Sequence, residues 1–374
     1  MRRQSQSAAT VAPRVWVLLN HRAGENNQIL ALAEALGWPF EVKRFTYRRG
    51  VPYLLLGASL AAIDRLRSDP LTPPWPDLIV SASARNEAIC RWIQREAARD
   101  GHRVRLVHIG RPFNRLDRFD LVITTPQYRL PRRPNVLHNS TTLHRVMPQR
   151  LAGEAARWQD RLAHLPGPKV AVLIGGSSGP YVMDAAAARE LARQAQALAA
   201  SKGGSLLVTT SARTRRGVLE AFLENVEVPV YAYQWRRDDP DNPYFAYLAL
   251  ADEIVVTCDS LSMLTEACAT GKPVHLFDLE AVRRPLWDWH PQRLRAALYR
   301  WAMDWLPKRL TRDLSLVHRQ LVIEGRLVWL GETARPVTPL NPPSLTDIER
   351  ATRRVRALFR EQPRIQPLLN AAFS

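Results

Sequence analysis

The chain has few cysteines, and the three present, Cys90, Cys258 and Cys268, are spaced unlike any zinc-binding pattern. Their number is odd, and each lies in an apolar stretch. We therefore expect small core residues rather than disulfides or metal ligands, in a protein of a reducing compartment.

Long hydrophobic runs are also absent. The longest, over residues 51–63, has 13 residues, whereas a helix that crosses a bilayer needs roughly 20. The first residues lack the apolar centre of a secretory signal peptide. The sequence therefore predicts a cytoplasmic protein, or one bound peripherally to the inner face of the inner membrane.

Acidic residues and lysine are scarce. The chain has 53 basic residues, of which 48 are arginine, against 35 acidic ones, so its formal net charge is +18. A GC-rich genome accounts for part of the arginine excess, and the remaining field attracts phosphates, anionic lipid or nucleic acid. The charge is spread along the chain, and no helix-turn-helix, RNA-recognition or OB-fold signature accompanies it, so we expect no nucleic-acid partner.

Short apolar runs alternate with helical patterns in the first half. The runs at 14–20, 40–47, 77–82, 104–109 and 120–124 predict strands, and helices are expected at 24–37 and 84–99. Such alternation is typical of βαβ units and a mainly parallel sheet.

The alternation stops at a polar helical stretch and restarts at residue 169. The sequence therefore predicts an α/β protein with two Rossmann-like domains. At 374 residues it is long enough for two to three domains of about 150 residues each. We place an N-terminal domain at 1–147, a linker at 148–168, a C-terminal domain at 169–340, and a C-terminal helix and tail at 341–374.

Small and hydroxyl residues follow two strands of the second half. Gly175, Gly176 and Ser177 come after the strand at 169–174, and Thr210, Ser211 and Arg213 end or follow the strand at 205–210. Backbone N–H groups and an arginine there suit a phosphate, because ligands of open α/β sheets bind at the carboxyl ends of strands. Tight turning by the glycines and helix capping by Ser211 are the competing explanations.

The most specific segment runs from Thr257 to Ala267. Its polar turn carries Asp259 and Ser260, and Ser262 and Met263 open the following helix. Glu266 lies six residues after Ser260, where a carboxylate could accept hydrogen bonds from two ribose hydroxyls. A capped helix with an exposed glutamate is the alternative. Asp238, Asp239 and Asp241 read as a solvated loop, and we predict no metal site.

Polar loops also end the strands of the first half. His21 and Glu25 are candidates for a general base, since either titrates usefully in a suitable environment. Acceptor contacts are expected from residues of three such loops: Gly24, Asn27, Gln28, Ser83, Arg85 and Arg111. Ordinary loop polarity and helix capping would explain the same residues.

One segment carries features of surface attachment. Residues 47–67, with Arg44, Arg48 and Arg49, run from basic to apolar and back to basic, which would suit docking on an anionic membrane surface, although a core-packed helix is the alternative.

After residue 280, tryptophans crowd a basic, partly helical segment, and residues 345–361 predict a final arginine-rich helix. These tryptophans are Trp287, Trp289, Trp301, Trp305 and Trp329.

Taken in order, these segments resemble a known family. The series NHRAGENNQ, DLIVSASAR, HIGRP, RFDLVITTPQYRLP, VLIGGSSGPY, LLVTTSARTR and NPYFAYLALADEIVVTCDSLSMLTEACATGKPV is similar to the mitochondrial-fission "elongated mitochondria" family. That family has plant and Gram-negative bacterial members, and we expect a bacterial one here. Its name describes a plant phenotype and is not carried over as a function.

The chain departs from the family pattern in two loops. Gln127-Tyr128 stand where the family usually has His-Asp, so no catalytic His-Asp pair is expected there. The loop that begins at Ser211 reads SART instead of SRRTP, which removes one basic residue from the expected phosphate site.

The resemblance implies a function as well as a fold. The family's domain pattern is similar to GT-B glycosyltransferases, which implies a nucleotide-sugar donor on the C-terminal domain, with diphosphate and ribose held between Ser260 and Glu266. A lipid or envelope-glycan acceptor would bind the N-terminal domain. GT-B transferases generally use no metal, so no cofactor is expected. The alternative is a non-catalytic nucleotide-binding adaptor that recruits partners to a membrane.

Overall fold

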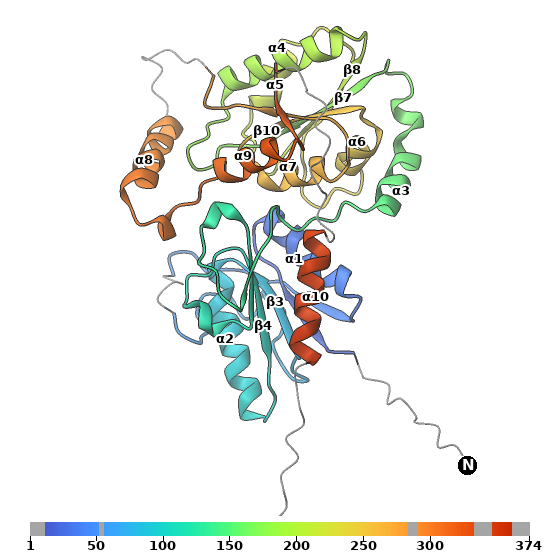
Figure 1. The fold of residues 1–374 in the computed structure, drawn as a ribbon. Coiled ribbons are helices and arrows are strands. Elements are labelled where there is room, and N and C mark those ends of the chain that lie inside the picture. The colour runs from blue at the N-terminus through green and yellow to red at the C-terminus, as the bar shows by residue number, and fades with distance from the viewer. Residues whose placement is uncertain (1–11, 52–55, 283–290, 333–345, 361–374) are drawn as a thin grey trace, which may run out of the picture.

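The protein has two α/β domains, seen in a computed structural model that describes residues 12–51, 56–282, 291–332 and 346–360. Each domain contains one six-stranded sheet, and every pairing within the two sheets is parallel. Figure 1 shows the two domains stacked, with helices on both sides of each sheet. This arrangement of two Rossmann-like domains is the GT-B type.

The N-terminal sheet has the strand order β2-β1-β3-β4-β5-β6. In β1, Val15 and Val17 face one apolar core while Trp16 and Leu18 face the other, so the strand is apolar throughout because both of its faces are covered. The elements are β1 (Val15–Leu18), α1 (Ala23–Leu36), β2 (Phe40–Lys43), β3 (Leu78–Ala82), α2 (Ala84–Arg99), β4 (Arg105–Ile109), β5 (Leu121–Thr124) and β6 (Val136–His138).

The C-terminal sheet has the order β12-β11-β10-β7-β8-β9. Its strands are β7 (Lys169–Ile174), β8 (Ser205–Thr210), β9 (Val230–Tyr233), β10 (Glu253–Thr257), β11 (Val274–Phe277) and β12 (Val328–Trp329). Its helices are α4 (Ala185–Ala200), α5 (Val218–Leu223), α6 (Tyr244–Leu250), α7 (Leu261–Cys268), α8 (Pro291–Trp305) and α9 (Ser315–Ile323).

The direction of winding reverses once in each sheet. The reversal falls between β1 and β3 in the N-terminal domain and between β7 and β10 in the C-terminal domain. Ligands of open α/β sheets bind outside the carboxyl ends of the strands at such a switch point. The loops after these four strands are therefore the places to look for a site.

The expected linker at 148–168 is part of the C-terminal domain. Its helix α3 (Pro148–Trp158) packs along α6. Trp158, Leu162 and Leu165 lie in the core of the C-terminal domain. An arginine-rich, polar composition concealed this role, because a few apolar side chains are enough to attach a short helix whose other residues stay at the surface.

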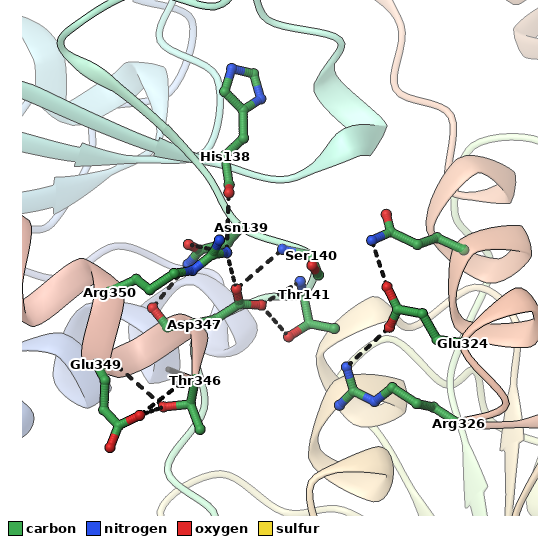
Figure 2. A network of polar contacts seen from close by, with 11 residues as sticks. His138, Asn139, Ser140, Thr141, Glu324, Arg326, Thr346, Asp347, Glu349 and Arg350 are labelled. Carbon is green, nitrogen blue, oxygen red and sulfur yellow. Dashed lines mark hydrogen bonds and ion pairs between the residues drawn. The ribbon is translucent and has the colours of Figure 1, made fainter. Parts of the chain in front are cut away.

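The last described helix, α10 (Asp347–Arg360), returns to the N-terminal domain. It packs on α1 through Ala351 and Val355. Figure 2 shows how its start is fixed: the Asp347 carboxylate accepts hydrogen bonds from the backbone N–H groups of Ser140 and Thr141, at 3.2 and 2.7 Å. The chain therefore crosses between the domains twice.

A capping box begins α10. The Thr346 N–H donates to the Glu349 carboxylate at 2.8 Å, and the Glu349 N–H donates back to the Thr346 hydroxyl at 3.4 Å (Figure 2). The pair satisfies N–H groups that a helix start otherwise leaves unpaired. The spacing Thr-x-x-Glu is visible in the sequence and supports the helix expected at 345–361.

The segment expected to dock on a membrane, 47–67, forms no helix in its described part. Tyr47 pairs with Ile63 as an isolated antiparallel bridge, and Ile63 is buried in the N-terminal core. Residues 52–55, which form part of its apolar run, lie outside the described residues. Among the helices described, none is long and apolar enough to cross a membrane.

Candidate functional site between the domains

The two switch points face each other across the domain boundary. Gly24, in the first turn of α1, lies so near the first turn of α7 that a Cβ built on it would be 2.9 Å from Ser262 Oγ. A second cross-domain contact joins the Thr142 and Thr265 hydroxyls at 3.0 Å. The amino ends of α1 and α7 thus converge, and the partial positive charge of each helix terminus favours an anion there.

Asp259 organises the C-terminal side of this site. Its buried carboxylate accepts hydrogen bonds from Gly176 N at 2.8 Å, from Arg213 Nη2 at 2.8 Å and from Thr257 Oγ1 at 2.7 Å. Gly176 and Arg213 lie in the loops after β7 and β8, and Thr257 ends β10. The Asp259 side chain therefore holds three segments together at the switch point. Its role is to position them, since its carboxylate is already engaged and is not open to ligand contact.

The two glycines after β7 are required by this packing. A Cβ at Gly175 would overlap the Asp259 carboxylate, and one at Gly176 would overlap the backbone carbonyl of Arg213. The Gly175 N–H donates to Thr257 Oγ1 at 2.8 Å. The close approach of three loops accounts for both glycines, which is the structural alternative considered for them above.

The start of α7 offers unpaired donors. Within the described part of the chain, no hydrogen bond is found to the backbone N–H groups of Leu261, Ser262 and Met263. The Ser260 hydroxyl does not cap the helix either. Free N–H groups at a helix start that faces a domain boundary are suited to a phosphate.

Arg213 contributes a positive charge to the C-terminal side of the site. Its side chain is 43% exposed although one nitrogen is paired with Asp259. The neighbouring hydroxyls are already engaged: Ser211 Oγ contacts Thr214 Oγ1 at 3.0 Å, and Thr210 Oγ1 accepts from Trp235 N at 2.8 Å. Ser211 does not cap α5, which begins at Val218.

Glu266 is buried rather than exposed on α7. Tyr244 Oη donates to Glu266 Oε2 at 2.5 Å, and burial raises the pKa of Glu266 to about 7 against the pull of Tyr244, Arg150 and Arg145. The carboxylate can reach ribose hydroxyls only if the Tyr244 contact gives way. Met263 is likewise in the apolar core of the C-terminal domain.

The candidate bases follow β1: His21 lies in the loop, and Glu25 lies in the first turn of α1. His21 lies at the surface with part of its ring covered. That partial burial, together with the charges of Arg85 and Arg22, lowers the pKa of His21. It is therefore neutral at pH 7 and able to accept a proton. Glu25 accepts hydrogen bonds from Asn20 Nδ2 and Arg22 Nη1, both at 2.9 Å.

Ser83 joins β3 to α2 in an unusual conformation. Its φ is 74° and its ψ is 134°, and its hydroxyl accepts weakly from Arg85 N at 3.4 Å. A positive φ costs a residue with a Cβ about 1–3 kcal/mol, and such residues cluster at functional sites. Arg85 lies over the ring of Tyr47, with its guanidinium carbon 5.5 Å from the centroid.

Other predicted residues take local roles. Gln28 Nε2 donates to Gly24 O at 3.2 Å, and Asn27 is half-buried on the first turns of α1. Ser177 Oγ accepts from Met183 N at 3.1 Å and contacts Gln292 of α8 at 3.2 Å. Asn27 and Gln28 therefore lie near the helix terminus at the boundary, and Ser177 points toward α8.

A second group of cross-domain contacts surrounds the loop Gln127-Tyr128. Asp313 N donates to Gln127 O at 3.0 Å, and Arg129 forms an ion pair with Asp313. Burial raises the pKa of Tyr128, whose hydroxyl is bonded to Arg312. Arg111 Nη1 donates to Lys308 O at 2.7 Å, so this expected acceptor contact instead ties the two domains together.

Sequence reasoning missed this second group and the Tyr244–Glu266 pair. The partners are separated by 22 to about 200 positions, and no local pattern links them. The one available signal was the departure of Gln127-Tyr128 from the family pattern, which marked the loop as different.

One hollow of the N-terminal domain lies away from this site. It has a volume of about 520 Å³ and lies beside Val104 and Phe119, at the amino end of β4, opposite to where α/β sheets bind ligands. In the part of the chain that the structure describes, no group of three or more His, Cys, Asp or Glu side chains could hold a metal ion.

The two Rossmann-like domains, with their switch points facing each other, define a GT-B-like protein. The family model described as "Mitochondrial fission ELM1" matches residues 23–359, so the chain belongs to that family. It is 29% identical over 244 residues to the mitochondrial fission protein ELM1 of Arabidopsis thaliana, which covers 59% of this chain and 56% of that protein. The chain thus spans a little over half the length of the plant relative.

A bacterial relative and two solved structures show further similarity. An uncharacterised protein of Rickettsia prowazekii is 24% identical over 297 residues, covering 70% of this chain and 82% of that protein. A UDP-glucosyltransferase from Polygonum tinctorium superposes with a TM-score of 0.48 at 12% identity, covering 94% and 99% of the two chains. A UDP-GlcNAc 2-epimerase from Neisseria meningitidis gives 0.46 at 12% identity, covering 93% and 100%.

Proposed function

We propose that the protein is a glycosyltransferase that moves a sugar from a nucleotide-sugar donor to a lipid or cell-envelope glycan acceptor at a membrane surface. One observation carries the proposal: the unpaired N–H groups at the start of α7 lie at the C-terminal switch point and face the first turn of α1. A diphosphate bound there would place its sugar between the domains.

The donor would bind along the C-terminal domain. The N–H groups of Leu261, Ser262 and Met263 would hold the diphosphate, and the exposed guanidinium of Arg213 would add a positive charge. The Gly175-Gly176 loop would border it. Glu266, with Tyr244, would support the ribose end. The nucleotide-sugar is a substrate, and no further cofactor is proposed.

The reaction would be a displacement at the anomeric carbon. An acceptor hydroxyl oxygen forms a bond to that carbon while the bond from the carbon to the diphosphate oxygen breaks. The diphosphate leaves with the electron pair, stabilised by the α7 N–H groups and Arg213. His21 or Glu25 takes the acceptor proton, and the acceptor would lie against Gly24, Asn27, Gln28, Ser83 and Arg85.

The test is a thermal-shift screen with UDP, GDP, CMP and ADP, each alone and with its sugar. A ligand that binds only the native state raises the melting temperature. We expect a shift with one nucleotide, reduced in Arg213→Ala and Glu266→Ala but kept in Arg216→Ala, a matched control with an exposed arginine on the same loop. No shift with any nucleotide would reject the donor site.

The same site should work without a divalent cation. In the proposed site, Arg213 and the helix N–H groups supply the positive charge that neutralises the diphosphate. The nucleotide-induced rise in melting temperature should therefore be unchanged by EDTA. Loss of the shift on chelation, restored by magnesium or manganese, would show that a metal holds the diphosphate.

The alternative is a non-catalytic nucleotide-binding adaptor. The contacts of Arg111 with Lys308 and of Arg129 with Asp313 favour it, because they engage cations on the acceptor side in joining the domains. An adaptor would bind a nucleotide without turnover. Transfer of a labelled sugar to envelope lipid by wild-type protein, but not by His21→Gln or Glu25→Gln, would exclude it.

A further inference from the structure

Helix α8 carries a row of apolar side chains on its outer face. Leu294, Leu298, Trp301 and Trp305, which we call the α8 stripe, are 49, 58, 55 and 76% exposed. Their spacing of four, three and four residues places them on one side of a helix. Single exposed apolar residues are normal, whereas a continuous row of them marks an interaction surface.

The opposite face of α8 is attached to the C-terminal domain. Ala296 is buried, Gln292 contacts Ser177, and Arg293 forms an ion pair with Asp184 at 3.1 Å. Tyr299 packs against Gly179, where a Cβ would be 3.1 Å from its ring. The helix is therefore fixed in orientation, and its stripe faces away from the domain. Figure 1 shows α8 at the flank of the C-terminal domain, outside the layers around the sheet.

Charge beside the stripe indicates what covers it. Residues 291–310 contain five basic residues and one acidic residue. Arg295 and Lys308 are exposed, and no ion pair is found for either within the described ranges. Apolar residues with tryptophan on one face and unpaired cations beside them are the features of a helix that lies in the interface of an anionic membrane.

A second copy of the chain fits this surface less well. A two-fold interface sets the same surface against itself, so Arg295 and Lys308 of one copy would approach those of the other. Like charges brought together cost energy, whereas anionic headgroups would neutralise them.

We propose that α8 docks the protein on an anionic lipid bilayer, with the α8 stripe inserted at the headgroup level. The inference rests on the proposed function for the purpose of docking. It deepens that function by naming the surface that meets the membrane. Since the inner face of α8 contacts the loop from Ser177 to Gly179, the membrane-bound helix also borders the proposed donor site.

The experiment is flotation of the full chain with phosphatidylcholine vesicles, with and without phosphatidylglycerol. We expect binding that requires phosphatidylglycerol, falls in high salt, and drops about tenfold or more in the double variant Trp301→Ser, Trp305→Ser. Ile323→Ser is the matched control, because this side chain is 79% exposed and lies outside the stripe. It should bind as the wild type does.

Three outcomes would overturn the proposal: no binding of the wild type, equal binding of the double variant, or a wild-type dimer that the double variant converts to a monomer. Brominated phospholipid should quench wild-type tryptophan fluorescence more than that of Trp301→Phe, Trp305→Phe.

Nucleotide-induced thermal shifts on the same samples separate the two proposals. Docking without any shift would reject the donor site alone. A shift in the wild type and in the double variant, without docking in either, would reject the membrane helix alone.

Discussion

The two domains build the same kind of edge in different ways. In the C-terminal domain a buried carboxylate, Asp259, holds together the segments that follow or end three strands. In the N-terminal domain the corresponding loops carry exposed or half-exposed groups such as His21 and Arg85, and a strained Ser83. The C-terminal edge is therefore fixed before any ligand arrives, whereas the N-terminal edge keeps its titratable groups in water.

This contrast agrees with the proposed division into a donor side and an acceptor side. A diphosphate is bound best by preorganised N–H groups, because they need no reorganisation when charge develops. A proton acceptor needs access to the hydroxyl that it deprotonates. Changes on the N-terminal side should then affect transfer, and changes on the C-terminal side should affect folding and donor binding.

The largest expected effect is the loss of sugar transfer when a residue of the loop after β1 is changed. If His21 is the base, His21→Gln should lower kcat/KM by about 100-fold or more. The wild-type acid limb should lie below pH 6.5, since the pKa of His21 is lowered by burial and by Arg85 and Arg22, and the variant should lack that limb. Sugar transfer measured against pH tests this. An unchanged acid limb in the variant would shift the role to Glu25, and the nucleotide thermal shift should be the same in both proteins.

The next effect is on the stability of the C-terminal edge. Gly175→Ala forces a methyl group into the Asp259 carboxylate and should cost about 3 kcal/mol of unfolding free energy, as overpacking does. Urea unfolding followed by circular dichroism measures it. Gly153→Ala is the matched control: this glycine lies in α3 with nothing within 4 Å of its Cβ position, and alanine there should stabilise by about 0.5–1 kcal/mol. Equal stabilities of the two variants would contradict the tight packing around Asp259.

A pH series tests the buried carboxylate of Glu266. Glu266 accepts one hydrogen bond, from Tyr244, and burial raises its pKa to about 7 from 4.5. Between these values the native state binds more protons than the unfolded state, so stability should fall as pH rises from about 4.5 to 7. In Glu266→Gln this fall should be smaller by about 2 kcal/mol. Urea unfolding at several pH values tests it, and identical slopes would show that Glu266 is not held protonated.

Much of the fold could be predicted because it depends on local patterns. The apolar runs of β1, β7 and β10 read directly as buried parallel strands, and the loops after them had to gather at one edge. What the sequence could not show was the direction of individual side chains. Asp259 and Glu266 look alike in the sequence, as acidic residues near a turn. In the structure, the Asp259 carboxylate points to the junction of three strand ends, whereas the Glu266 carboxylate contacts Tyr244. The return of α10 and the burial of Trp158 are tertiary contacts that no local spacing encodes.

The smallest expected effect tests the strain on the N-terminal edge. Ser83→Gly should raise the unfolding free energy by about 1 kcal/mol, because glycine adopts a φ of 74° without the cost that a Cβ imposes. The weak Ser83–Arg85 contact at 3.4 Å is too long to offset the gain. Urea unfolding of this variant, with Ser83→Ala as the control that keeps the strain, measures the difference. If the N-terminal edge stores strain that positions Arg85, the glycine variant gains stability and loses transfer together. If instead both variants destabilise equally, the Ser83 hydroxyl rather than the backbone matters, and the contrast between a relaxed C-terminal edge and a strained N-terminal edge is wrong.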